Sequence, residues 1–253
     1  MNSIIPCRGG YLMAAPHDIP IPFRIIALMQ ERNRLFAYPL KHMSEEIRDT
    51  GFQCDCCGMC CTRAVNRHIF LLDHDVAALK KIDPFAYEPA PDPEFCDQDG
   101  TFYVSGYALR MKSDAEGSCW FLENGKCRIN NNRFSGCRIY PHMLRRSPDG
   151  SGSVSWQRFA KKNRHGRYGN FLTDEECLVR AREIKEYESA YLNQQIAFLE
   201  TIHDFFSVHD LQHDPELYHR RMQQYRQGMP VEINVFDNGN LEKYRIWKPD
   251  FSR

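Results

Sequence analysis

The stretch GFQCDCCGMCC, from Gly51 to Cys61, carries five cysteines in eleven residues. Cys54, Cys57 and Cys60 are spaced three apart, and Cys61 follows the last of them directly. Two intervening residues let neighbouring thiolates turn toward one point, and this spacing recurs in zinc and iron–sulfur sites. The stretch therefore predicts a metal site, with disulfides and redox-active thiols as the alternatives.

The composition favours metal over disulfides. The chain has eleven cysteines in 253 residues, and nine of them lie between Cys54 and Cys137. Its first residues have no basic region before an apolar run, and no apolar stretch approaches the about 20 residues of a membrane span. We therefore expect a cytoplasmic protein without a membrane segment, in which clustered thiols bind metal. Translation can start at Met1 or at Met13, which would remove Cys7.

A metal centre of this kind needs more ligands than the first run supplies. Zinc takes four ligands in a tetrahedron, and a four-iron cluster takes four thiolates. Three cysteines further along the chain are the expected additional donors, and two of them bound a polar loop. The predicted metal ligands are Cys54, Cys57, Cys60, Cys61, Cys119, Cys127 and Cys137. Cys7, Cys96 and Cys177 have no motif partner, so we expect them to be structural or incidental.

Charge is distributed unevenly although the formal net charge is zero. Residues 71–104 contain eight acidic and two basic residues, whereas residues 105–170 contain thirteen basic and four acidic ones. Lys and Arg near clustered thiols lower the thiol pKa and stabilise thiolate charge. The alternative is a solvated basic face. The zero net charge and the lack of a recognised nucleic-acid fold disfavour nucleic acid as a partner.

The patterning predicts an α+β fold. A helix is expected from about Phe23, and another is expected to be capped by Asp73. Residues 101–112 and 118–129 read as short strands, the latter with a turn at Asn124-Gly125, and residues 147–153 read as a turn between hairpin arms.

A long helix is expected from Thr173, where Thr173 and Glu176 form a capping box. A second helix is expected over about 215–227, followed by a C-terminal hairpin that turns at Asn238-Gly239. We divide the chain into an N-terminal extension (1–49), a cysteine-cluster metal-binding domain (50–172) and a helical segment with a terminal hairpin (173–253).

These motifs resemble a known family. FQCDCCGMCC, the pair of cysteines around WFLENGK and the sequence CRIYP after FSG look like the YkgJ family of cysteine-cluster proteins, over about Phe52 to Thr173. The resemblance implies a zinc- or iron-chelating domain. Flagellin lysine N-methylase contains a related domain, for which the resemblance implies an iron–sulfur cluster and methyl transfer.

The chain departs from that family in two places. Asn163 stands where the family often carries a further cysteine, and His165 nearby is a candidate substitute ligand. Cys56 is an additional thiol inside the first motif. Because it is adjacent to Cys57, we expect it to point away from the metal.

Two functional hypotheses and two cofactors stay open. The first function is a metal-binding protein with a role in assembly, sensing or metal handling, acting with an unidentified protein partner or substrate. The second is an iron–sulfur-dependent, methyltransferase-like enzyme. All-thiolate ligation suits both zinc and iron–sulfur clusters. Seven thiols exceed the four of a single zinc site, so we slightly prefer an iron–sulfur cluster, with two zinc ions that share ligands as the alternative.

Overall fold

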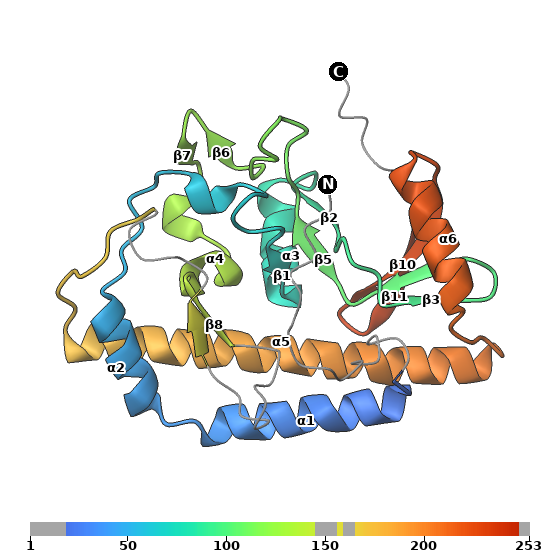
Figure 1. The fold of residues 1–253 in the computed structure, drawn as a ribbon, viewed down its shortest axis with the longest axis horizontal. Helices are drawn as coiled ribbons and strands as arrows, with labels where there is room; N and C mark the ends of the chain where they lie inside the picture. The colour runs from blue at the N-terminus through green and yellow to red at the C-terminus, as the bar shows by residue number, and fades with distance from the viewer. Residues whose placement is uncertain (1–18, 145–155, 159–164, 248–253) are drawn as a thin grey trace, which may run out of the picture.

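One long helix runs along the whole molecule. The computed structural model describes residues 19–144, 156–158 and 165–247. Helix α5 (Asp174–Val208) lies along the longest dimension, with α1 (Ile21–Ala37) on one side and the strands and cysteine-rich part on the other (Figure 1). Helix α2 (Leu40–Thr50) also packs against α5. The predicted α+β class is confirmed.

Helix α5 begins where the capping box predicts. The Thr173 N–H donates to Glu176 Oε2 at 2.8 Å, and the Glu176 N–H donates to Thr173 Oγ1 at 3.2 Å. These reciprocal bonds satisfy two backbone donors that a helix start leaves unpaired. Further along, Phe198 packs against Phe95 and Phe236, which belong to strands at the far end of the molecule. The helix therefore supports both the cysteine-rich part and the C-terminal part.

A four-stranded sheet joins the C-terminal hairpin to the middle of the chain. Its order is β11 (Asn240–Ile246), β10 (Val231–Asp237), β4 (Phe102–Val104) and β3 (Phe95–Cys96). Strand β10 pairs in parallel with β4, and Ile233 lies opposite Phe102. The division of the chain into three segments stays a prediction, and this pairing places parts of two segments in one sheet.

The remaining strands are short. A three-stranded sheet has the order β1 (Phe70–Leu71), β5 (Tyr107–Leu109) and β2 (Tyr87–Pro89). Strands β6 (Leu122–Glu123) and β7 (Lys126–Cys127) form a hairpin through Asn124-Gly125, as predicted. Both turn residues have positive φ, of 50° and 74°, which Asn and Gly tolerate best.

Two further hairpins match the sequence patterns. Strand β8 (His142–Leu144) pairs antiparallel with β9 (Trp156–Arg158), so the predicted arms meet, although the expected turn at 147–153 lies outside the described residues. Strands β10 and β11 turn at Asn238-Gly239, as expected. Helix α6 (Pro215–Arg226) precedes them and is also close to its predicted bounds.

Three helical features differ from the sequence-based expectation. Helix α2 was not predicted, because its short amphipathic face depends on few apolar residues, among them the buried Met43 and Ile47. Helix α4 (Ser135–Ile139) is too short to show a periodic pattern. The expected cap of α3 (Asp73–Ile82) was wrong: Leu72 occupies the cap position, and its N–H donates to Asp75 Oδ2 at 3.4 Å.

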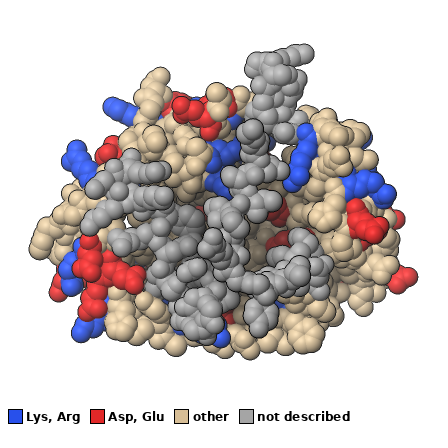
Figure 2. Space-filling view, viewed as in Figure 1, with Lys and Arg blue, Asp and Glu red and all other residues tan. Residues whose placement is uncertain are grey.

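The acidic and basic segments of the chain meet within the fold. Arg128 and Arg110 of the basic segment lie 3.8 Å from Asp83 and Glu88 of the acidic segment, respectively. The Trp120 Nε1–H also donates to Asp83 Oδ2 at 2.8 Å. On the face seen in Figure 2, Lys and Arg are interspersed with Asp and Glu. Part of the charge polarity therefore serves packing between two segments.

None of the helices in the described part of the chain combines the length and the apolarity that a bilayer crossing requires.

We expect Phe198→Ala to lower the free energy of unfolding by about 3–5 kcal/mol, because the ring is fully buried between two strands and its loss leaves a cavity. The matched control is Phe171→Ala, which removes a ring that is 90% exposed and should change stability by no more than about 0.5 kcal/mol. Urea unfolding of both variants measures the difference. Equal losses in the two variants would contradict the packing described for α5.

Candidate metal centre

All seven predicted ligands line one cavity of about 50 Å³. This volume is several times the volume that a cavity needs to hold one water molecule. They come from three separate parts of the chain: the loop from Gly51 to Cys61, the β6–β7 region and helix α4. An eighth thiol, that of Cys56, lines the same cavity. Apolar side chains complete the wall, and they include Phe52, Ile69, Leu109, Met111, Phe121 and Ile129.

The first cysteine run is fixed at its start by backbone bonds. The Gln53 N–H donates to the Arg167 carbonyl at 2.8 Å, and the Arg167 N–H donates back to Gln53 at 2.9 Å. The ring of Phe52 packs edge-on against Tyr140 at 5.7 Å and Tyr168 at 5.2 Å between centroids. This corner therefore holds Cys54 close to the segment that follows the last cysteine motif.

The end of the same run is bonded directly to the second motif. The Cys119 N–H donates to the Cys61 carbonyl at 2.7 Å, beside an isolated antiparallel bridge between Thr62 and Ser118. The Cys119 carbonyl in turn accepts from the Leu122 N–H at 2.9 Å. Two motifs that are remote in sequence are therefore held in a fixed register.

The hairpin formed by β6 and β7 positions Cys127. Its turn returns the chain so that the Arg128 N–H donates to the Phe121 carbonyl at 2.9 Å. Cys127 is the last residue of β7 and is half-buried at the cavity wall.

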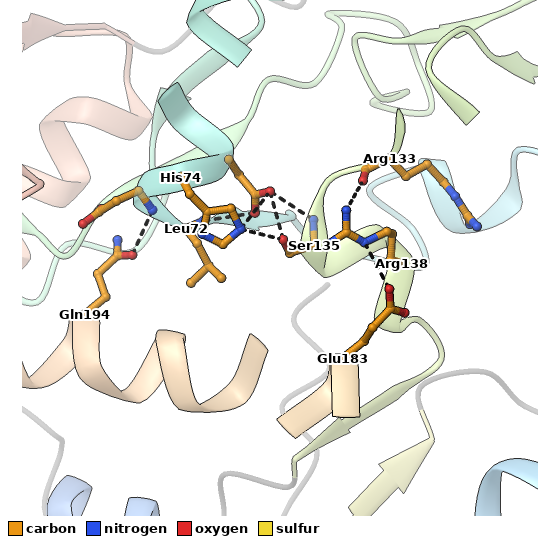
Figure 3. A network of polar contacts seen from close by, with 9 residues as sticks. Leu72, His74, Arg133, Ser135, Arg138, Glu183 and Gln194 are labelled. Carbon is orange, nitrogen blue, oxygen red and sulfur yellow. Dashed lines mark hydrogen bonds and ion pairs between the residues drawn. The ribbon is translucent and has the colours of Figure 1, made fainter. Parts of the chain in front are cut away.

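Helix α4 positions Cys137, and a carboxylate from α3 holds the start of that helix. Asp75 Oδ1 accepts from the Ser135 N–H at 3.1 Å and from the Ser135 hydroxyl at 3.0 Å. Asp75 and Ser135 are both buried. Figure 3 shows His74 reaching the same serine, with 2.9 Å between Nε2 and Oγ. One buried carboxylate thus fixes the starts of both α3 and α4.

Helices α3 and α4 also contact helix α5. The Arg138 guanidinium lies 4.0 Å from Glu183, and the Gln194 side-chain oxygen accepts from the Asp73 N–H at 3.2 Å (Figure 3). The last cysteine motif is therefore attached to the long helix as well as to α3.

The thiols perturb one another. Burial raises the pKa of Cys119 to about 12, and the thiols of Cys61 and Cys127 add to the increase. Burial also raises the pKa of Cys137, with Cys119 as the largest contributing neighbour. A hydrogen bond from Cys60 lowers the pKa of Cys61 to about 7, while the Cys60 pKa rises in return. Several thiolates in one cavity repel one another, and a bound cation would relieve that repulsion.

Two polar side chains lie at the cavity wall, and the cationic one, Arg133, suits an anionic group of thiolates. Arg133 lowers the pKa of Cys61 after the effect of its Cys60 partner, and its buried Nε has no hydrogen-bond partner among the described residues. The buried Oδ1 of Asn130 is likewise without a partner there. Sequence spacing did not single out either residue. The soft thiol donors, together with an adjacent guanidinium, suit zinc or an iron–sulfur cluster.

The thiols surround the cavity without meeting at one point. Within the described residues, no three His, Cys, Asp or Glu side chains form a group arranged to hold an ion as they stand. The described residues include ten cysteines, and all ten are free thiols, so none of the predicted ligands is in a disulfide.

The histidines differ in their relation to the site. His165 lines the cavity, and its Nε2 lies 2.5 Å from the Tyr140 hydroxyl. The cavity lining within the described residues does not include His68, His74 or His142. The candidate position Asn163 lies outside the described residues.

The cysteines without motif partners lie elsewhere. Cys96 belongs to β3, and Cys177 is buried on α5 among the residues that pack against α2. Cys56, which we expected to point away from the metal, lines the same cavity as the predicted ligands and has a positive φ of 59°.

The cysteine-rich segment matches a known domain family. Residues 53–167 match the family model CxxCxxCC, described as "Putative zinc- or iron-chelating domain". Neither a curated protein nor a solved structure matches the chain. The predicted resemblance is confirmed over these residues, which are similar to the cysteine-cluster domains that this family model describes.

We expect Asp75→Ala to lower the free energy of unfolding by about 1–3 kcal/mol, because it leaves buried donors of Leu72 and Ser135 without an acceptor. Displacement of α4 should also lower the metal content of the protein. The control His74→Ala removes a side chain that is 64% exposed and should cost less than about 1 kcal/mol. Urea unfolding and elemental analysis measure both effects. Equal behaviour of the two variants would contradict the role of the carboxylate.

The raised thiol pKa values predict how stability depends on pH. A thiol whose folded pKa lies above the unfolded value of about 8.5 stabilises the fold below that pH, and this stabilisation is lost as the pH rises through the folded pKa. We therefore expect the free energy of unfolding of reduced, metal-free protein to fall between about pH 8.5 and pH 12. Anaerobic urea unfolding with a chelator measures it. The fall should be shallower in Cys119→Ala, and a flat profile in the wild-type protein would contradict the burial of these thiols.

Proposed function

We propose that the chain is a metal-binding protein in which the cavity holds an iron–sulfur cluster through the thiolates of Cys54, Cys57, Cys60, Cys61, Cys119, Cys127 and Cys137. The observation that carries the proposal is the convergence of these seven side chains, from three remote parts of the chain, on one cavity. The match to a chelating-domain family supports it independently.

The number and setting of the thiols favour a cluster over a single zinc ion. A structural zinc site uses four ligands, whereas eight thiols line this cavity. Apolar and aromatic side chains such as Phe121 shield the thiols from water. The guanidinium of Arg133 compensates part of the negative charge that thiolate ligation creates. A zinc-loaded protein is the alternative outcome of the test below.

The function that fits this arrangement is cluster or metal handling, in assembly or sensing, with a protein partner in the cytoplasm. A methyltransferase-like activity is supported by the motif resemblance alone, and no contact in the described residues favours it. Several thiols line the cavity without being deeply buried, which leaves them accessible to exchange with a partner.

The test is the metal content of protein purified without oxygen. We expect a brown protein with charge-transfer absorption that contains iron and acid-labile sulfide. Cys119→Ser and Cys137→Ser should each retain less than half of the wild-type metal, because each removes a thiolate from the cavity wall.

Cys96→Ser and Cys177→Ser are the matched controls. Both change buried cysteines that lie outside the cavity, so the metal content should stay at the wild-type level. A colourless protein that contains zinc would indicate that the cavity holds zinc and not a cluster. Wild-type protein without metal, or equal losses in all four variants, would overturn the proposal.

A further inference from the structure

The residues of the first cysteine run alternate between half-buried and exposed, although Asp55 and Cys57 line the cavity as Cys54 and Cys56 do. Cys54, Cys56 and Cys60 are half-buried, whereas Asp55, Cys57 and Met59 are exposed. Sequence spacing assigns Cys57 to the metal and excludes Cys56. In the structure, Cys56 is the less exposed of these two adjacent thiols.

Backbone geometry explains this alternation. Cys56 adopts a positive φ of 59°, and Gly58 follows with a φ of 76°. A residue other than glycine rarely adopts the left-handed region, and such conformations concentrate at functional sites. The two left-handed residues reverse the chain locally, so that the Cys56 side chain lines the cavity wall.

The partners of the two thiols differ accordingly. Cys56 lines the cavity together with Cys54 of the same run and Cys127 of the second motif. Cys57 is exposed and lies beside an exposed carboxylate, because its N–H donates to Asp55 Oδ1 at 3.1 Å. Cys57 therefore lies at the mouth of the cavity.

We propose that Cys56 is an eighth ligand inside the metal cavity and that Cys57 is the ligand at its mouth through which metal is exchanged. The inference rests on the proposed function, because it concerns the same cavity. Coordination by either thiol releases its proton to solvent, and no oxidation or reduction takes place. Loss of Cys56 lowers the amount of metal held. Loss of Cys57 also removes a ligand, and in addition it slows the exchange of the metal that remains.

The first experiment uses wild-type protein and needs no substitution. The full chain is loaded anaerobically with iron and sulfide, and in a parallel sample with Zn²⁺, and is then treated briefly with iodoacetamide. Mass spectrometry should find Cys57 alkylated faster than Cys56 in the loaded protein, and both alkylated rapidly after metal removal. Protection of Cys57 with alkylation of Cys56 would overturn the inference.

The second experiment compares Cys56→Asn with Cys57→Ser. Asparagine is among the residues that best tolerate a positive φ, so this substitution removes the thiol and keeps the local backbone. Cys56→Asn should retain half or less of the wild-type metal. Cys57→Ser should also hold less metal than the wild type, and the metal that remains should be lost to EDTA several-fold more slowly. Circular dichroism confirms that both variants are folded, and Cys56→Gly, which also permits the backbone, replaces Cys56→Asn if needed.

The outcomes separate this inference from the proposed function. Wild-type protein that takes up neither iron–sulfur nor Zn²⁺ would remove the metal site itself. If the wild-type protein takes up metal, a fully loaded Cys56→Asn or an unchanged rate of metal release from Cys57→Ser would overturn only the division of roles between the two thiols.

Discussion

The hydrogen bond between the Cys119 N–H and the Cys61 carbonyl is the contact on which the candidate site depends. At 2.7 Å it joins the end of the first cysteine run to the start of the second motif. The β6–β7 hairpin then follows from one side of this junction, and the loop from Gly51 to Cys61 follows from the other. Helix α4 completes the cavity wall from a third direction. A backbone bond, which does not depend on side-chain identity, thus determines which thiols become neighbours.

The parts of this architecture that local chemistry specifies could be predicted from the sequence. Thr173 and Glu176 form the capping box that starts α5, and Asn124-Gly125 and Asn238-Gly239 form tight turns because these residues tolerate positive φ. The cysteine spacing identified thiols that share one cavity, since ligand motifs are local patterns. The residues 53–167 that match a chelating-domain family fall within the predicted segment.

The parts that depend on long-range contacts could not be predicted. The parallel pairing of β4 with β10 depends on a surface that forms only when the chain is folded. Asp75 accepts a hydrogen bond at the start of α4 although it belongs to a different helix, and no local sequence pattern predicts such an acceptor. The orientation of Cys56 was missed because sequence adjacency to Cys57 says nothing about a reversal of the backbone at a positive φ. Arg133 was one of thirteen basic residues in its segment, and only its position at the wall distinguishes it.

The parallel pairing of β10 with β4 has a consequence for fragments of the chain. Strand β4 lies inside the sheet because β10 covers one of its edges, although the hairpin that contains β10 comes from the far end of the sequence. A fragment that stops after α5 would leave this edge open, with unpaired N–H and C=O groups along a row of apolar residues. Open edges of this kind recruit strands from other molecules. The C-terminal hairpin therefore protects the cysteine-rich part against self-association.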